Sequence, residues 1–179
     1  MDIGIGLFGL GTVGSGVVKI LQDNADQIAK RTGTHLLVKH AVVNNLEKKR
    51  TGFINNFPIT NDAKDILNNP EIQIVVEVMG TLDQAYKIIK DSLTAKKHVV
   101  TANKDLIASR GQELVAIAEA NGVDLFFEAA VAGGIPILRT LANSFTADEI
   151  SRVAGIINGT SNFILTQMTT NKLSYANAL

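Results

Sequence analysis

The chain has 179 residues, and its 17 Lys and Arg residues balance its 17 Asp and Glu residues, which gives a formal net charge of zero. A protein that follows nucleic-acid phosphates needs a basic surface, so this balance argues against a nucleic-acid binder. The absence of cysteine excludes disulfide bonds, thiolate metal sites and a cysteine nucleophile, and the hydrophobic fraction of 46% is typical of a packed globular protein.

The sequence carries no recognisable signal for export or membrane insertion. The amino terminus has Asp2 where a signal peptide would have Lys or Arg. No uninterrupted apolar stretch approaches the ~18 residues that a membrane-spanning helix needs. We therefore expect a cytoplasmic protein with no membrane or nucleic-acid partner.

Short apolar runs alternate with amphipathic helical patterns up to about residue 128. This alternation is typical of βαβ units, in which right-handed crossovers place helices on both faces of a parallel sheet. The predicted fold class is therefore α/β, with a doubly wound parallel sheet. The expected strands cover residues 3–8, 36–43, 72–79, 98–100 and 123–127, with an edge piece at 57–59, and the expected helices cover residues 12–30, 82–93 and 112–120.

The pattern changes after Gly133 and Gly134. We expect a helix over residues 135–142, a strand over residues 150–158, and further helices over residues 161–168 and 173–179. Because the last helical pattern runs to Leu179, and a natural domain rarely ends within a helix, we expect the chain to be the amino-terminal portion of a longer protein.

A glycine-rich turn, Gly9-Leu10-Gly11-Thr12-Val13-Gly14, connects the first predicted strand to the first predicted helix. In a dinucleotide site the first glycine of G-x-G-x-x-G permits the tight turn, the second lets the backbone approach a pyrophosphate, and the third lets helix and strand pack closely. The helix amino terminus offers unpaired N–H groups to the anion. A purely structural turn is the alternative. We predict a Rossmann-type domain whose cofactor contacts are Phe8, Gly9, Gly11, Thr12, Val13 and Gly14.

The end of the second predicted strand bears on the choice between NAD and NADP. An NAD-specific site usually has an acidic residue there, bound to the ribose 2′-hydroxyl. This chain has Asn44 and Asn45 instead, followed by three cations from Lys48 to Arg50. A 2′-phosphate is then tolerated and the cations can hold it, although an ordinary solvated loop explains them equally well. We predict use of either cofactor with a preference for NADP, and candidate contacts at Asn44, Lys48 and Arg50.

Polar residues follow the strand predicted at 98–100, ending in Asn103 and Lys104. Ligands of open α/β sheets bind in the crevice at the carboxyl ends of the strands. Lys104 can therefore face substrate or nicotinamide, where an ammonium that loses hydration can exchange protons near neutral pH. A lysine that reaches into solvent is the more common situation for any single lysine.

Two glutamates also lie at or near strand ends. Glu77 interrupts an otherwise apolar strand, so it is either paired or reaches water. Glu128 opens a loop of small residues that runs to Pro136, and inward-facing carbonyls of such a loop can coordinate a hard cation. A tight structural turn explains this loop equally well.

Five segments together resemble homoserine dehydrogenase: residues 9–18, 76–81, 98–105, 127–136 and 155–165. They occur in the family's order across nearly the whole chain, and the later segments are far more specific than the glycine turn. The resemblance implies NAD(P)-dependent interconversion of L-homoserine and L-aspartate 4-semialdehyde, a step toward threonine and methionine. It also implies an NAD(P)-binding Rossmann domain over residues 1–130 and the start of an α+β substrate and dimerisation domain over residues 131–179.

The resemblance further assigns site residues. It implies that Lys104 is catalytic and lies with Asn103 beside substrate and nicotinamide, and that Gly80 and Thr81 match a Gly-Gly pair near the cofactor ribose. Asn44 and Asn45 replace a frequent Arg-Asp pair, which leaves the cofactor preference open. The carbonyls expected to bind a monovalent or similar cation belong to Glu128, Val131, Gly133 and Ile135.

An acid-rich signature of the family, with a second catalytic lysine and substrate-binding carboxylates, is expected to begin after Leu179. The resemblance therefore implies a chain that binds dinucleotide but turns over substrate poorly or not at all by itself, within a full-length protein that forms a homodimer. Two alternatives stay open: another NAD(P)-dependent reductase of a small aldehyde or imine, and a dinucleotide-sensing module without enzymatic activity.

Overall fold

The computed structural model describes residues 2–48, 50, 57–155 and 158–179. The chain divides into two compact units, Met1–Val131 and Ala132–Leu179. Among the described residues, no helix is both long enough and apolar enough to cross a membrane. Lys49, one of the three cations expected near the cofactor, lies outside the described residues.

Unit 1 contains a six-stranded sheet in the order β3-β2-β1-β4-β5-β6, in which all neighbouring strands run parallel. The order reverses at β1, which pairs with β2 on one side and β4 on the other. This arrangement confirms the predicted doubly wound α/β fold, and it places a switch point between β1 and β4. The strands are β1 (Asp2–Phe8), β2 (His35–Val42), β3 (Ile59–Thr60), β4 (Ile72–Glu77), β5 (His98–Thr101) and β6 (Leu125–Phe126).

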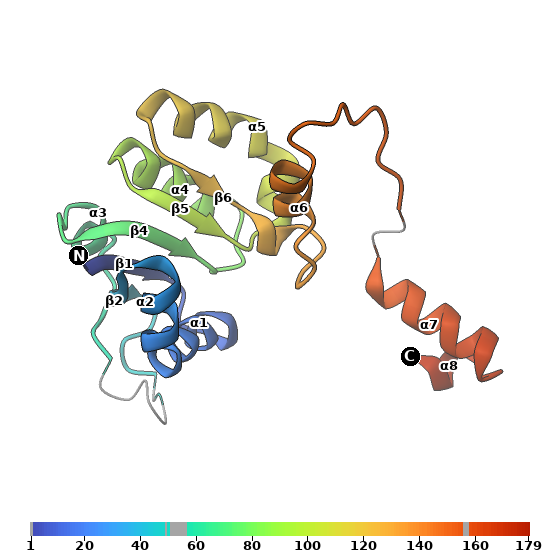
Figure 1. Ribbon diagram of the computed structural model, residues 1–179. Coiled ribbons are helices and arrows are strands. Elements are labelled where there is room, and N and C mark those ends of the chain that lie inside the picture. Colours follow the sequence, from blue (N-terminus) through green and yellow to red (C-terminus); the bar gives the residue numbers. More distant parts are fainter. Residues whose placement is uncertain (1, 49, 51–56, 156–157) are drawn as a thin grey trace. The chain divides into compact units, whose positions relative to one another are not determined.

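Helices cover both faces of this sheet, as Figure 1 shows for α1 and α2 on one side and α4 and α5 on the other. Strand β1 explains the division, since its side chains alternate between the faces. Leu7 packs with Val18 of α1, whereas Phe8 packs with residues of α3, α4 and α5. The helices of unit 1 are α1 (Thr12–Asp23), α2 (Ala25–Thr32), α3 (Lys64–Leu67), α4 (Asp83–Thr94) and α5 (Lys104–Asn121), followed by the short 3₁₀ helix η2 (Glu128–Ala130).

At Gly6, the face of β1 toward α3 leaves no room for a side chain. A Cβ atom built on Gly6 would lie 2.4 Å from Cγ2 of Ile66, and Ile66 is fully buried. The short helix α3, which the apolar pattern does not predict, therefore packs directly against the backbone of β1. Because α3 belongs to the crossover from β3 to β4, this contact supports the pairing of β1 with β4.

The predicted helix over residues 12–30 is interrupted. Asn24 lies between α1 and α2 with φ −113° and ψ 19°, and both its backbone N–H and its side-chain amide donate to the carbonyl of Ile20 at 3.1 Å. An asparagine that bonds the preceding turn in this way competes with the next helical hydrogen bond. The chain resumes as α2 and ends at Gly33 in the left-handed conformation (φ 76°), as expected for a glycine cap.

Helix α5 begins at Lys104 rather than at residue 112. The side chain of Asn103 accepts a hydrogen bond from the N–H of Leu106 and caps the helix, and this cap starts the helix directly after β5. The helix is kinked at Arg110, where φ is −136°. The guanidinium of Arg110 lies 3.3 Å from the centre of the Tyr86 ring, which fastens α5 to α4 at the kink.

Unit 2 contains α6 (Ile137–Ser144), α7 (Gly159–Thr170) and α8 (Tyr175–Ala178), and α8 packs on α7. The strand predicted over residues 150–158 is wrong for the described part of that segment, residues 150–155 and 158, which contains no strand. An apolar run forms a strand only where another strand offers hydrogen bonds, and the described residues of unit 2 contain none. Asn158 instead caps α7 by accepting from the N–H of Ser161 at 2.8 Å.

Candidate functional site

The glycine turn after β1 has the geometry that its spacing predicts. Gly9 has φ +101°, a conformation that favours glycine, and a Cβ atom on Gly9 would lie 2.8 Å from the carbonyl oxygen of Val78. A Cβ atom on Gly14 would lie 2.0 Å from the carbonyl oxygen of Gly9, so the third glycine brings α1 against the turn. A Cβ atom on Gly11 would meet no heavy atom within 4 Å. The second glycine therefore faces open space, where a ligand can approach the backbone.

The amino terminus of α1 is suited to an anion. Gly11 caps the helix without a side-chain hydrogen bond, and the first turn contains no acidic residue. The first helical bond runs from the N–H of Ser15 to the carbonyl of Gly11 at 2.9 Å, so the N–H groups that precede it have no acceptor within the helix. Thr12 and Val13 are exposed at this end. Phe8, which the sequence also offered as a cofactor contact, is fully buried, backbone included, and presents no surface to a ligand in this structure.

The turn is tied to both neighbouring strands. The N–H of Gly9 donates to the carbonyl of Val42 on β2 at 3.1 Å, and the N–H of Val78 donates to the carbonyl of Phe8 at 2.9 Å. The turn thus sits at the switch point of the sheet, with the end of β2 on one side and the loop after β4 on the other. This is the place where a dinucleotide lies across the strand ends of such folds.

On the other side of the switch point, Glu77 ends β4 and is fully buried. Its Oε1 accepts the N–H of Met79 at 2.8 Å, and its Oε2 accepts the hydroxyl of Thr101 at 2.6 Å. Of the two possibilities that the sequence leaves for Glu77, pairing or an exit to water, the structure shows pairing. Sequence reasoning did not single out Thr101, because nothing in the sequence shows that it lies opposite Glu77 in the register of β4 and β5.

Asn103 joins the loops that follow β4 and β5. Its N–H donates to Oγ1 of Thr101 at 3.1 Å, and its side-chain amide donates to the carbonyl of Thr81 at 2.7 Å. Gly80, beside Thr81, has φ +74°, which a side chain would strain. Lys104 is the first residue of α5 and is exposed. The structure therefore brings Gly80, Thr81, Asn103 and Lys104 together at the carboxyl ends of the neighbouring strands β4 and β5.

The loop after β2 is closed by its own hydrogen bonds. Oδ1 of Asn45 accepts the N–H groups of Glu47 and Lys48 at 2.8 and 3.0 Å. The guanidinium of Arg50 donates to the carbonyls of Asn45 and Lys48, each at 3.0 Å. The guanidinium of Arg50 thus forms hydrogen bonds within its own loop in this structure, whereas the side chains of Asn44 and Lys48 are exposed.

Comparison with known protein families shows to which family the chain belongs. The family described as "Homoserine dehydrogenase, NAD binding domain" matches residues 9–128, and the family described as "Homoserine dehydrogenase" matches residues 136–179. The chain belongs to the homoserine dehydrogenase family. The resemblance inferred from the five sequence segments is thereby confirmed.

Curated homoserine dehydrogenases match nearly the whole chain. The enzyme of Bacillus subtilis is 49% identical over 177 residues, which cover 99% of this chain and 41% of that protein. The enzyme of Corynebacterium glutamicum is 42% identical, and the match covers 99% of this chain and 40% of that protein. This chain thus spans about 41% of the length of such relatives.

Solved homoserine dehydrogenases share the fold. The crystal structure from Thiobacillus denitrificans superposes with a TM-score of 0.90 at 45% identity, covering 100% of this chain and 41% of that one. A hyperthermophilic archaeal homoserine dehydrogenase in complex with NADPH superposes with a TM-score of 0.79 at 25% identity, covering 99% of this chain and 59% of that one.

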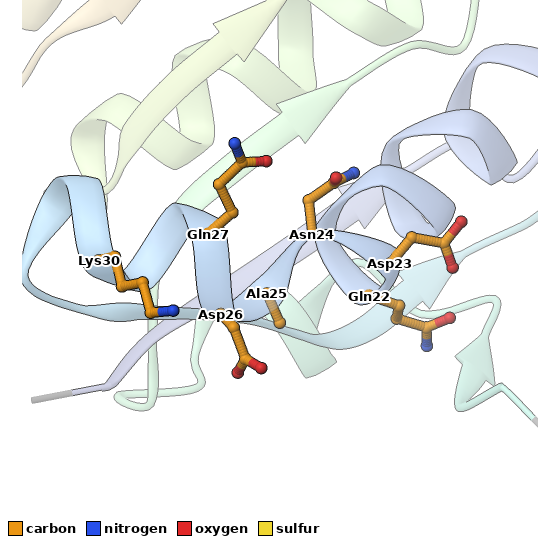
Figure 2. A pocket seen from close by; sticks show the side chains of 7 residues that line it. All are labelled: Gln22, Asp23, Asn24, Ala25, Asp26, Gln27 and Lys30. Carbon is orange, nitrogen blue, oxygen red and sulfur yellow. The ribbon is translucent and has the colours of Figure 1, made fainter.

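The residues of this homoserine dehydrogenase family member fit a nicotinamide dinucleotide. The open position at Gly11 leaves the backbone accessible, and the uncapped start of α1 supplies N–H donors for a diphosphate. A different hollow lies at the opposite end of α1, where Figure 2 shows polar side chains around the junction with α2. Asp23, the last residue of α1, lines that hollow. This hollow is therefore separate from the glycine turn.

The residues predicted to bind a cation fall in both units. Glu128 begins η2, and its carbonyl accepts the N–H of Val131 at 3.0 Å within unit 1. Gly133, with φ +59°, and Ile135 belong to unit 2, where the carbonyl of Ile135 accepts the N–H of Ile137 at 2.8 Å. A carbonyl oxygen can accept two bonds, so a hydrogen bond to it does not by itself prevent cation binding. The cation site stays a prediction.

Proposed function

We propose that this chain is the NAD(P)-binding part of an enzyme that interconverts L-homoserine and L-aspartate 4-semialdehyde. One observation carries the proposal. The turn at the switch point leaves Gly11 open to a ligand and Gly14 closed against the turn, within a segment that matches the NAD-binding domain of the family. The archaeal relative solved with NADPH supports the choice of ligand.

The division of labour follows from the two sides of the switch point. The free N–H groups of the first turn of α1 bind the diphosphate, which fixes the cofactor across the strand ends. The nicotinamide, when bound, supplies the hydride chemistry at the substrate carbon. Gly80, Thr81 and Asn103 border the place of the nicotinamide ribose. Alignment of the cofactor with the substrate can account for ~7–11 kcal/mol of barrier lowering in a well-formed site.

Lys104 is the proposed catalytic residue. Its cation lies in the first turn of α5, at the positive end of the helix, where a positive charge is unfavourable by roughly 0.3–1 kcal/mol. A cost of this kind is accepted where the charge is used, and an ammonium at this place can orient and polarise the substrate oxygen. The unit itself leaves Lys104 exposed, so its charge is accessible to a ligand.

The proposal includes three further assignments. Asn44 and Lys48 lie exposed beside the expected position of the adenosine ribose, and because asparagines replace the usual acidic residue at the end of β2, we propose that NADP is preferred over NAD. The carbonyls of Glu128, Val131, Gly133 and Ile135 are proposed to bind a monovalent or similar cation. The full-length enzyme is proposed to be a cytoplasmic homodimer.

The test is activity of the complete gene product that contains this chain. Absorbance of the reduced nicotinamide is followed with L-homoserine and either NAD or NADP, and oxidation of homoserine with at least one cofactor is the expected result. Turnover only with another substrate of a test panel would identify a different reductase. Tight cofactor binding without any turnover would identify a sensing module.

Substitution of Lys104 tests its role separately. Lys104→Ala is expected to lower kcat by about a hundredfold or more, as for loss of a group that handles a proton or polarises the reacting oxygen. The matched control is Lys87→Ala, which removes an exposed lysine from α4. Equal turnover of the wild-type and Lys104→Ala enzymes would remove Lys104 from the site.

A further inference from the structure

The carboxylate of Glu77 is buried without a counter-charge. Glu77 has 0% exposure, and among the described residues no Lys, Arg or His lies within ion-pair distance of it. A carboxylate that leaves water costs several kcal/mol unless hydrogen bonds or an opposite charge compensate. Within the part of the chain that the structure describes, two donors reach Glu77, the N–H of Met79 and the hydroxyl of Thr101. An apolar residue would fill this position at a lower cost, so the carboxylate serves another purpose.

That purpose follows from the direction of the hydrogen bonds. A carboxylate only accepts, so the hydroxyl of Thr101 must donate to it. The lone pairs of Thr101 Oγ1 then remain available for the N–H of Asn103, at 3.1 Å. A glutamine at position 77 has a donor amide as well as an acceptor oxygen. That amide would face Thr101 and leave the proton of the threonine hydroxyl without its acceptor, or else it would face the N–H of Met79.

Glu77 thereby fixes two loops from one buried point. Through Oε1 it holds Met79, which leads into Gly80 and Thr81 after β4. Through Thr101 it holds Asn103, and the side chain of Asn103 closes the circuit by donating to the carbonyl of Thr81 at 2.7 Å. A buried network of this kind is rigid only when all of its members are satisfied.

We infer that Glu77 is a positioning residue for the nicotinamide-ribose half of the cofactor, an inference that rests on the proposed function. The two nucleotides of a dinucleotide lie on opposite sides of the switch point, and the diphosphate lies at the glycine turn between them. The backbone of Glu77 pairs with Phe8, but its side-chain hydrogen bonds run to Met79 and Thr101 rather than to the glycine turn or the loop after β2. Its network holds only the loops after β4 and β5, so it acts on one half of the ligand.

Binding of two ligands to the 179-residue chain separates the halves. ADP reports on the adenosine half up to the diphosphate, and the tighter binder of NADH and NADPH reports on the whole cofactor. In Glu77→Gln we expect the affinity for the reduced dinucleotide to fall by about tenfold or more, the size of one lost charge-assisted hydrogen bond. The affinity for ADP is expected to change by less than about twofold, because the ADP subsite keeps its contacts. The fluorescence of the bound nicotinamide is expected to shift toward that of the free cofactor.

Substitutions of Thr101 test the same network from its other side. Thr101→Val removes the hydroxyl with little change in shape and is expected to reproduce the selective loss, while Thr101→Ser keeps the hydroxyl and is expected to restore binding. Ser92→Ala is the matched control, because Ser92 is equally buried and donates to the carbonyl of Ile88 at 2.7 Å, away from both loops. It is expected to lower the melting temperature without changing either affinity.

The outcomes distinguish the inference from the function on which it rests. Equal losses of ADP and dinucleotide affinity in Glu77→Gln would show a merely structural role and overturn the inference, as would unchanged affinity for both ligands. If Glu77→Gln does not fold, the same criteria apply to Thr101→Val. Failure of the wild-type chain to bind either ligand would instead refute the proposed function, and the inference with it.

Discussion

Alanine at Gly11 separates ligand binding from folding, because a methyl group there would have no protein heavy atom within 4 Å. Alanine at Gly14 makes the opposite change, since its methyl group would lie 2.0 Å from the carbonyl oxygen of Gly9. The two substitutions add the same group three residues apart in one turn. They form a matched pair that differs in the surroundings of the methyl group and in the backbone, which is extended at Gly11 and helical at Gly14.

The structure sets the expected magnitudes. At Gly11 the backbone is extended (φ −87°), which alanine adopts without strain, so the free energy of unfolding is expected to change by about 1 kcal/mol or less. The methyl group would, however, occupy the approach of the diphosphate. Loss of one charge-assisted hydrogen bond of about 1.5–3 kcal/mol lowers affinity by roughly 10–200-fold. At Gly14 the overlap forces α1 away from the turn, which costs about 1–3 kcal/mol in stability.

The assay is titration calorimetry with NADPH and NADH, paired with thermal unfolding of each variant. Gly11→Ala is expected to keep the melting temperature within a few degrees while losing most of its affinity. Gly14→Ala is expected to melt roughly 2–12 °C lower than the wild-type chain. Wild-type affinity in Gly11→Ala would refute the assignment of this turn as the diphosphate contact, and an unchanged melting temperature in Gly14→Ala would refute the packing argument.

Three further predictions concern other parts of unit 1. Burial lowers the pKa of the Lys97 ammonium, whose Nζ donates to the carbonyls of Asn69 and Ile72. The unfolded chain then binds more protons in the alkaline range, so this residue makes the free energy of unfolding rise with pH as the pH approaches the ordinary pKa of lysine from below, and Lys97→Met should abolish that rise in urea titrations. Asn103→Ala removes the cap of α5 and should cost about 0.5–2 kcal/mol in the same titrations; no loss would argue against the cap. Lys48→Ala should weaken NADPH binding more than NADH binding in calorimetry, and equal effects would return Lys48 to the role of a solvated loop residue.

The sequence is most informative where the structure depends on local chemistry. The turn from Gly9 to Gly14 could be predicted because the positive φ of Gly9 and the close contact of Gly14 with Gly9 depend on residues within the turn itself. The parallel, doubly wound sheet likewise follows from the alternation of apolar runs and amphipathic helices. Asn24 shows the limit of this reasoning, since the apolar spacing continues through it and only its hydrogen bonds to Ile20 divide α1 from α2.

Long-range pairing lies beyond such reasoning. The partner of Glu77 could not be named from the sequence, because Thr101 is 24 residues away and meets it only through the register of β4 and β5. Arg50 was predicted to contact a cofactor, yet its guanidinium bonds the loop that carries it, a choice that residue type alone does not reveal. In the described part of residues 150–158 the predicted strand is wrong, and Asn158 caps α7 instead, which the apolar pattern before it does not reveal.

Strands β1 and β4 are neighbours in the sheet, although β2, β3 and α3 lie between them in the sequence. The proposed diphosphate site needs the turn after β1 beside the loop after β4, so it forms only once both halves of the sheet have joined along this seam. A coenzyme that binds only the joined state adds ~2.7 kcal/mol to the stability of the native protein when its concentration is a hundred times the Kd. On the proposed function, coenzyme binding therefore stabilises the join between the two halves of the sheet and is expected to lower the fraction of unfolded chain that a protease can cleave.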